Sequence, residues 1–146
     1  MEEITNPLKV AFADTYAFYV KAQNYHWNVE GPMFPMYHDF FGKIYEEVGA
    51  AIDPFAEEIR AAGAYAPGAL GRYSELSSIE DEVLIIAASQ MVTILFADNA
   101  KVLGSLTIAR NAADNAMAYG LVNFLEERLD AHQKHAWMLK VTMKIV

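Results

Sequence analysis

Apolar side chains recur every three to four positions over the first part of the chain, which is the period of a helix with one buried face. The first positions with this spacing are Leu8, Phe12, Tyr16 and Tyr19. Asn6 is a suitable N-cap and Pro7 a suitable first helical residue, so the pattern predicts that the helix begins there. It should stop near Gly31-Pro32, because glycine ends helices readily and the residue before proline avoids the helical region.

The second predicted helix runs from about Pro35 to Ala62, where Gly63 is a natural stop. Its apolar stripe has coiled-coil-like spacing and consists of Tyr37, Phe41, Ile44, Val48, Ala51, Phe55 and Ile59. Pro54 lies in the interior of this helix and removes a backbone hydrogen bond, so we expect a bend just before it.

Three small residues, Gly42, Gly49 and Ala56, lie seven positions apart along a neighbouring stripe of the same predicted helix. The distance between two packed helices depends on the side chains at their contact, and small side chains shorten it. We therefore expect another helix to approach closely at this stripe.

The second half of the chain predicts two more long helices. Residues 63–76 predict a long connection with one short helix, and Ser77-Ser78-Ile79-Glu80 has the form of a capping box that opens a helix through about Arg110. Residues 111–115 look like a turn, after which the last helix has an apolar face made by Leu125, Leu129, His132, Ala136, Leu139 and Met143. The pattern predicts an all-α, ferritin-like four-helix bundle that forms a single domain over residues 1–146.

The composition adds expectations about partners. Apolar residues make up 54% of the chain and charged residues 21%, which predicts that part of the surface lies between subunits of an oligomer. A net charge of −8 and termini without a basic arm argue against direct DNA binding and favour cations as partners. The absence of cysteine excludes disulfides, thiolate metal sites and thiol nucleophiles.

The sequence predicts neither a leader peptide nor a membrane span, and we expect a cytoplasmic protein. The most apolar run extends from Val83 to Phe96, but it is too short to cross a bilayer and contains Ser89, Gln90 and Thr93. We interpret this run as a buried helix.

The candidate metal ligands are four histidines and a set of carboxylates. A di-iron site in the core of the bundle would need Glu-x-x-His on two helices. The residues three positions before His26, His38, His132 and His135 are Gln23, Pro35, Leu129 and His132. None of them is glutamate, so the sequence argues against this type of centre. His132, on an apolar stripe, is better explained as a core histidine, and His135 has no clear role.

Asp53 and Glu57 lie one turn apart on one face of the second helix, and with Glu58 they could simply form a solvated acidic face. His38 lies within roughly 60–100° of them around the helix, but more than ~20 Å away along its axis. One chain therefore cannot place all three on one ion. An antiparallel copy related by a two-fold axis would bring His38 beside Asp53 and Glu57 of the partner. The stripe of small residues would permit the approach of this partner helix, and His26 could complete the site.

The segment Asn24-Tyr25-His26-Trp27-Asn28-Val29-Glu30-Gly31-Pro32-Met33-Phe34, followed by His38 and by Asp53 with Ala56-Glu57, resembles the signature of the Dps miniferritins. His132-Gln133-Lys134-His135-Ala136-Trp137-Met138-Leu139 resembles the last helix of that family, so the likeness spans most of the chain.

The resemblance implies a twelve-subunit hollow shell that oxidises iron(II), typically with hydrogen peroxide, and stores ferric mineral. It implies ferroxidase ligands His26 and His38 from one subunit with Asp53 and Glu57 from its two-fold partner. Trp27 and Trp137 would pack nearby as possible radical sinks.

Three features depart from the family pattern. Gly42 occupies the place of an aspartate, which would remove an oxygen ligand unless Asp39 or Glu46 replaces it. Pro54 directly follows a proposed ligand and could shift it. Near the start of the last helix Asn123 replaces an aspartate, so that an ion pore would depend on the remaining acidic residues Glu126, Glu127 or Asp130.

Three functions remain open at this point. The first is an iron-storage cage with ferroxidase activity. The second is a cage whose activity is weakened or absent because of Gly42, acting in metal sequestration or as a scaffold. The third is DNA compaction, against which the acidic termini argue.

Overall fold

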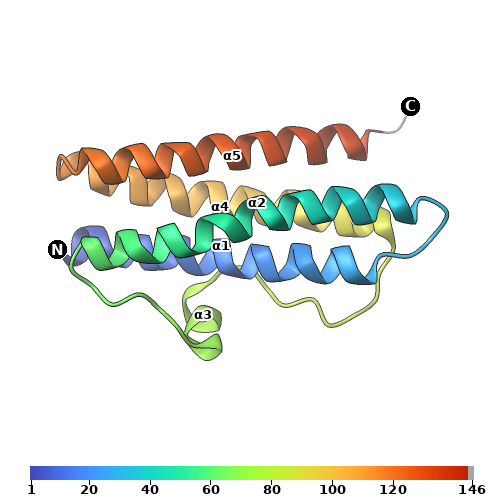
Figure 1. Cartoon of the computed structure of the whole chain (residues 1–146), viewed down its shortest axis with the longest axis horizontal. Coiled ribbons are helices and arrows are strands. Elements are labelled where there is room, and N and C mark those ends of the chain that lie inside the picture. Colours follow the sequence, from blue (N-terminus) through green and yellow to red (C-terminus); the bar gives the residue numbers. More distant parts are fainter. Residues whose placement is uncertain (145–146) are drawn as a thin grey trace.

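Four long helices lie side by side, and one short helix sits outside them against the first (Figure 1). The computed structural model describes residues 1–144, which contain no strand. The helices are α1 (Glu2–Asn28), α2 (Phe34–Ala61), α3 (Leu70–Leu76), α4 (Ala88–Asn115) and α5 (Tyr119–Met143). The prediction of an all-α four-helix bundle with a short helix in the connection between the second and third long helices is confirmed.

The core forms where α1 packs against α2 and α4, and α4 packs against α5. Phe55 of α2 holds three helices together, because its ring makes edge contacts with Phe12 of α1 at 5.5 Å and with Phe124 of α5 at 5.4 Å. Each fully buried side chain of this size contributes about 1.5–3 kcal/mol. The predicted apolar stripe of α2 is buried from Phe41 to Ile59, and the helix continues through Pro54 without a break.

The first helix begins at Glu2 and not at Asn6. Thr5 anchors the additional turn, because its backbone N–H and its hydroxyl both donate to the carbonyl oxygen of Met1, at 3.0 and 3.2 Å. Pro7 therefore lies inside the helix, where it leaves a single carbonyl, that of Glu3, without its helical partner.

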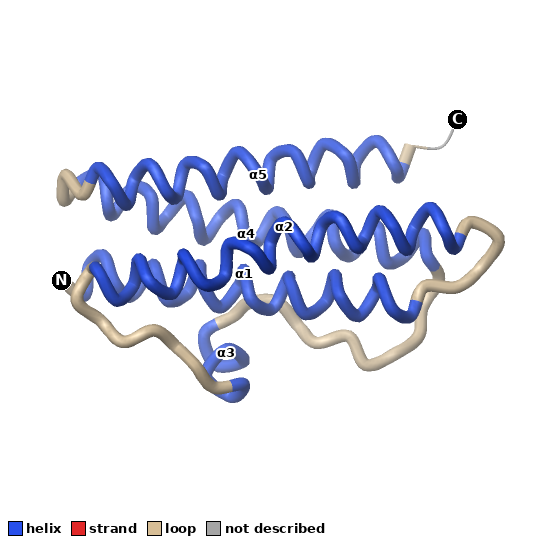
Figure 2. The backbone as a smooth tube through the Cα atoms, viewed as in Figure 1, coloured by secondary structure: helices blue, strands red, loops and turns tan. Residues whose placement is uncertain are grey.

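The predicted capping box at residues 77–80 is wrong, and so is the reading of residues 83–96 as one buried helix. Residues 77–87 form an open connection, drawn as loop in Figure 2, and α4 begins only at Ala88. Ser77 and Ser78 serve a different purpose, since both donate hydrogen bonds to the carboxylate of Asp14, which is buried on α1. A buried carboxylate needs such donors, and this requirement holds the segment in an extended form.

The predicted turn at residues 111–115 is also wrong, because these residues are the last turn of α4. The chain reverses at residues 116–118, where Met117 adopts a left-handed backbone with φ of 57°. Arg110 ties the two helices together beside this turn, with Asp114 at 3.2 Å and Glu126 of α5 at 2.9 Å. The turn was predicted because asparagine and aspartate are common in turns. In the structure the helix continues through these residues to Asn115.

Among residues 1–144, α4 is long and apolar enough to span a membrane by length and composition. The window that meets this test is 44% buried inside the protein. Its buried residues, which include Leu95, Val102 and Leu106, belong to the common hydrophobic core of the bundle. We therefore interpret α4 as a core helix.

A polar network crosses the interior of the bundle between α2, α4 and α5. The guanidinium of Arg128 donates two hydrogen bonds to Glu47, at 2.6 and 3.1 Å, and a third to Nε2 of His132 at 3.2 Å. Nδ1 of His132 donates to Asn99 at 2.8 Å, and His135 binds Glu47 at 2.7 Å. His132 is thus a core histidine with both ring nitrogens occupied, as predicted, and the role of His135 is to hold Glu47.

Charge balance in this network depends on a neutral His132. Burial, reinforced by the charges of Arg128 and His135, holds the pKa of His132 well below its usual range. Burial alone would raise the pKa of Glu47, but hydrogen bonds from His135 and Arg128 outweigh it and lower the pKa to about 2. At neutral pH the folded protein therefore contains an ionised Glu47 and an uncharged His132.

The pKa values of His132 and Glu47 are lower in the folded chain than in the unfolded chain, so we predict that acid destabilises the fold in two steps. The unfolded chain protonates His132 near its ordinary pKa of about 6.5, and the folded chain does not, so the free energy of unfolding should fall below that pH by on the order of 1 kcal/mol per pH unit. Glu47, with a lowered pKa, adds a further loss between its unfolded value of 4.5 and about 2. Urea unfolding at fixed protein concentration from pH 8 to pH 2 measures both.

The variant His132→Gln tests the assignment of the first step. Glutamine still presents a donor and an acceptor but cannot take up a proton, so this variant should be less stable at pH 8 and show a flatter dependence between about pH 6.5 and 5. An unchanged slope would mean that another group is responsible.

Candidate metal centre

Two histidines meet where α1 ends and α2 begins. His26 lies in the last turn of α1 and His38 in the first turns of α2, and Gly31, with φ of 122°, allows the short reversal between them. Their rings stack with centroids 3.8 Å apart and an angle of 18° between the planes. The sequence motif has therefore folded into a single pair of parallel imidazoles.

The two histidines hold each other in place by reciprocal hydrogen bonds. Nδ1 of His26 bonds to the backbone oxygen of His38 at 2.6 Å, and Nδ1 of His38 bonds to the backbone oxygen of His26 at 2.7 Å. A carbonyl oxygen only accepts, so each Nδ1 carries the proton. In the neutral rings the lone pair then lies on Nε2, which is the orientation that backbone carbonyls impose on metal-binding histidines.

The proposed vacancy at Gly42 is filled by the ring of His26. A Cβ atom at position 42 would lie 2.9 Å from Nδ1 of His26, and one at position 49 would lie 2.8 Å from the ring of Tyr19. The closely approaching helix is thus α1 of the same chain, which corrects the expectation that Gly42 and Gly49 make room for a partner subunit. Gly42 is required for the present position of His26.

The two proposed carboxylate ligands lie farther along α2. Asp53 and Glu57 are exposed and take part in none of the ion pairs or side-chain hydrogen bonds found within residues 1–144. Fifteen residues at 1.5 Å each separate Asp53 from His38 by about 22 Å along the helix. In the described part of the chain, no three metal-binding side chains come together. One subunit thus presents a pair of imidazoles and, well apart from it, a pair of carboxylates.

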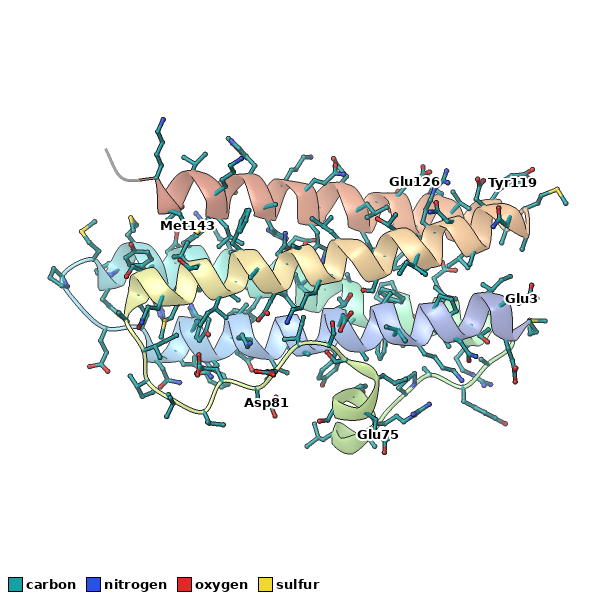
Figure 3. The ribbon with its side chains drawn as sticks, turned by 180° about the vertical axis from the view of Figure 1, so that it is seen from behind. Glu3, Glu75, Asp81, Tyr119, Glu126 and Met143 are labelled. Carbon is teal, nitrogen blue, oxygen red and sulfur yellow. The ribbon has the colours of Figure 1, made fainter. Side chains whose placement is uncertain are left out.

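Most of the other acidic residues singled out from the sequence form ion pairs or hydrogen bonds within the chain. Asp39 pairs with Lys43 at 2.9 Å, whereas Glu46 is exposed. Of the pore candidates, Glu126 binds Arg110, Glu127 accepts a hydrogen bond from Asn123 at 3.5 Å, and Asp130 pairs with Lys134 at 3.1 Å. Figure 3 shows Glu126 near Tyr119, at the beginning of α5.

The aromatic neighbours of the histidine pair differ from those expected. Trp27 and Trp137 are 63% and 65% exposed and do not pack inside this chain. The ring of Tyr45 lies 5.1 Å from that of His26, and Phe34 stacks on His38 at 5.0 Å. Tyr45 falls between two residues of the apolar stripe of α2, so periodicity gave no reason to single it out.

Comparisons with known proteins identify the family of the chain. The model of the ferritin-like domain family matches residues 6–145. The DNA protection during starvation protein of Brevibacillus brevis is 32% identical over 132 residues, which cover 90% of this chain and 89% of that protein. DNA protection during starvation protein 2 of Bacillus anthracis is also 32% identical, over 95% of each chain.

Solved structures give the same result. A Dps protein from Bacillus brevis superposes with a TM-score of 0.91 at 30% identity, covering 97% of this chain and 95% of that one. Dps from Staphylococcus aureus has a TM-score of 0.94 at 28% identity, covering 100% and 98%. The chain therefore belongs to the ferritin-like family and, within it, to the Dps miniferritins.

Proposed function

We propose that this protein binds iron(II) at sites shared between two subunits, oxidises it with hydrogen peroxide or oxygen, and stores the ferric product inside a hollow dodecameric cage. The observation that carries this proposal is the reciprocal pair of His26 and His38, which leaves two Nε2 lone pairs free beside each other. The exposed carboxylates of Asp53 and Glu57 supply the complementary half when a second subunit lies antiparallel.

The donor set suits iron as a substrate. Imidazole binds iron(II) well, and carboxylates stabilise the ferric product because they are hard, charged oxygen ligands. Two iron(II) ions give two electrons to hydrogen peroxide, and with two protons the products are two iron(III) ions and two waters. His26 and His38 hold the substrate while Asp53 and Glu57 compensate the added positive charge.

Assembly of a cage is supported by apolar surface around the histidine pair. The exposed side chains there are Trp27, Met33, Phe34 and Met36, and a second exposed group at the end of α5 comprises Trp137, Met138 and Val141. Isolated subunits rarely leave so many large apolar side chains in water. The net charge of −8 favours entry of cations and opposes DNA, so DNA compaction is not part of the proposal. We place the protein in the cytoplasm.

Gly42 favours a second candidate, a cage that sequesters iron without fast oxidation. The glycine supplies no oxygen where the family pattern has an aspartate. Anaerobic iron(II) titration followed by addition of peroxide separates the two functions. Binding together with rapid oxidation supports the first, and binding with oxidation no faster than a protein-free blank supports the second.

Complementation between defective chains tests the shared site. His38→Ala and Asp53→Ala should each abolish fast iron(II) oxidation, because every site then lacks a ligand. Refolding equal amounts together gives about half mixed dimers, each with one intact site, so roughly a quarter of all sites should recover. The measurement is the initial rate of iron(II) oxidation by absorbance, with mixed assembly verified by mass spectrometry.

A mixture of His38→Ala with His26→Ala is the matched control. Both histidines come from the same subunit in the proposed site, so every mixed site retains a damaged half and no rate should return. Recovery in this control, or none in the mixture of His38→Ala with Asp53→Ala, would rule out the proposed division of ligands.

Substitution of Gly42 tests the packing of His26. A new Cβ would lie 2.9 Å from Nδ1 of His26 and should displace the ring, so Gly42→Ala and Gly42→Asp should slow the initial rate of iron(II) oxidation. Loss of such an orienting contact typically costs about 10-fold to 100-fold at metal sites.

Gly104→Ala provides the matched control, because this helical glycine on α4 has no heavy atom within 4 Å of a Cβ. It should leave the rate unchanged and increase stability by about 0.5–1 kcal/mol. Faster oxidation by Gly42→Asp would instead mean that the wild-type site lacks an oxygen ligand and that the ring of His26 can move aside without loss of activity.

A further inference from the structure

The interior of the bundle contains three side chains of the types that bind iron(II). They are Glu47 of α2 with His132 and His135 of α5, which we call the interior triad. Two imidazoles and one carboxylate form a common ligand set for a single iron(II) ion. The two histidine rings have their centroids 5.4 Å apart, and Nε2 of His135 lies 2.7 Å from Glu47. One chain thus holds the ligands of a metal site within its own core.

The guanidinium of Arg128 lies between these ligands. It donates to both carboxylate oxygens of Glu47, at 2.6 and 3.1 Å, and to Nε2 of His132 at 3.2 Å. Because Nδ1 of His132 donates to Asn99, the lone pair of Nε2 points toward the guanidinium. One positively charged group therefore takes up the lone pairs that a metal ion would need. As it stands the triad is not placed for metal binding, which holds for every group of ligands within residues 1–144.

Packing alone does not account for a charged arginine at this position. Arg128 is buried, and its Nε has no hydrogen-bond partner within residues 1–144. A buried charge and an unpaired donor both cost free energy. Apolar side chains of similar volume often replace a buried ion pair without loss of stability. Any benefit of the guanidinium must therefore include something other than the stability of the fold.

We propose that Arg128 determines where this protein binds metal, because its guanidinium takes the place of a divalent cation in the interior triad and keeps the triad closed. The inference rests on the proposed function only for its consequence, which is that iron(II) is directed to the sites shared between subunits. Specificity of this kind comes from blocking the wrong site as well as from building the right one.

Removal of the guanidinium would open the triad. Imidazole nitrogens and carboxylate oxygens bind such metals at about 2.0–2.2 Å, so the ligands need to move inward by only about 1 Å into the vacated space. The side chain of Glu47 is 38% exposed and free to make this movement. His135 can carry its proton on Nδ1 and present Nε2 to the metal.

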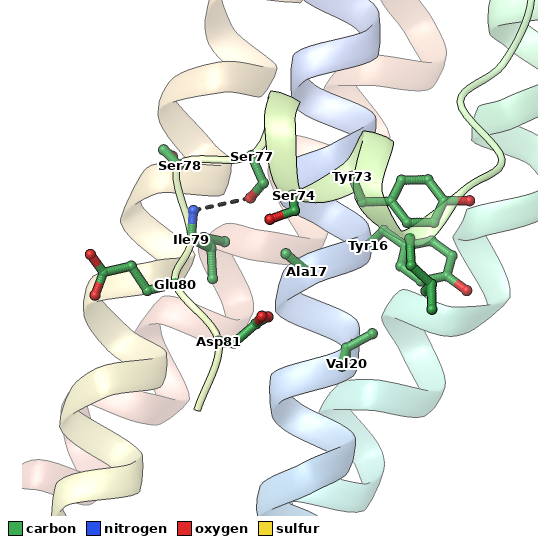
Figure 4. Close-up of a pocket in the computed structure, with 11 residues that line it drawn as sticks. Tyr16, Ala17, Val20, Tyr73, Ser74, Ser77, Ser78, Ile79, Glu80 and Asp81 are labelled. Carbon is green, nitrogen blue, oxygen red and sulfur yellow. Dashed lines mark hydrogen bonds between the residues drawn. The ribbon is translucent and has the colours of Figure 1, made fainter. Parts of the chain in front are cut away.

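Closure of the triad leaves one pair of histidines for iron(II). The chain has four histidines, of which two belong to the pair at the end of α1 and the start of α2 and two to the interior triad. A hollow of about 630 Å³ between α1, α3 and residues 77–81 is lined by Glu80 and Asp81 (Figure 4). Among residues 1–144, those that line this hollow include no histidine.

The test uses the assembled protein with Asp53→Ala, which disables the shared sites, and cobalt(II) as the probe. In this parent, Arg128→Leu keeps apolar bulk but removes the guanidinium, so each chain should bind one additional cobalt(II). The bound ion should give visible ligand-field absorption bands and raise the urea midpoint of unfolding. A further substitution, His132→Gln, should abolish both effects because it removes a ligand.

Arg128→Lys in the same parent is the matched control, because lysine retains a positive charge at this position. It should bind no more cobalt(II) than the parent. Equal cobalt(II) binding by assembled Arg128→Leu and its parent would overturn the proposal, and so would an equal gain in Arg128→Lys.

The outcome is also decided if Arg128→Leu does not assemble without metal. Assembly restored by cobalt(II) would support the interior site, and failure to assemble in its presence would overturn it. None of these measurements depends on iron oxidation. A protein that binds cobalt(II) as predicted but does not oxidise iron(II) would therefore refute the ferroxidase proposal and leave the role of Arg128 standing.

Discussion

Two hydrogen bonds between the end of α1 and the start of α2 determine most of what this protein can do chemically. Each runs from a histidine Nδ1 to the backbone oxygen of the other histidine, at 2.6 and 2.7 Å. They fix the corner between the helices, the stacking of the rings and the identity of the free nitrogens together. Gly42 permits this arrangement, because any side chain there would compete with His26 for space. The backbone geometry therefore determines the arrangement of the histidine pair as much as the two imidazole rings do.

The interior of the bundle explains why the candidate centre lies at the surface. Many proteins with four-helix bundles bind metals between the helices. Here the guanidinium of Arg128 lies in that space with Glu47, and the buried His132 is held neutral by burial and by nearby positive charge. A divalent cation would have to displace a fixed positive charge and compete for a carboxylate that is already paired. The candidate ligands that remain are the half-buried histidine pair and the exposed carboxylates of α2, which lie too far apart within one chain to bind the same ion.

The sequence predicted the number and type of the long helices because their apolar periodicity is long and regular. It failed at the boundaries where polar side chains have distant partners. Ser77 and Ser78 look like the start of a helix until Asp14, more than sixty positions earlier, is seen to require their hydrogen bonds. His26 and His38 could be predicted from their motif, and His132 from its place on an apolar stripe. The ion pair of Glu47 with Arg128 could not be predicted, because it joins residues 81 positions apart. No local pattern contains such a contact.

The central claim is that iron sits between subunits, with imidazoles from one and carboxylates from the other. Anomalous diffraction at the iron edge, from crystals of the assembled protein soaked anaerobically with iron(II), tests it directly. The account predicts an anomalous peak bounded by His26 and His38 of one subunit and by the partner subunit's Asp53 and the partner subunit's Glu57. A peak inside the bundle beside Glu47 and His135, or one bound by residues of a single chain, would contradict it.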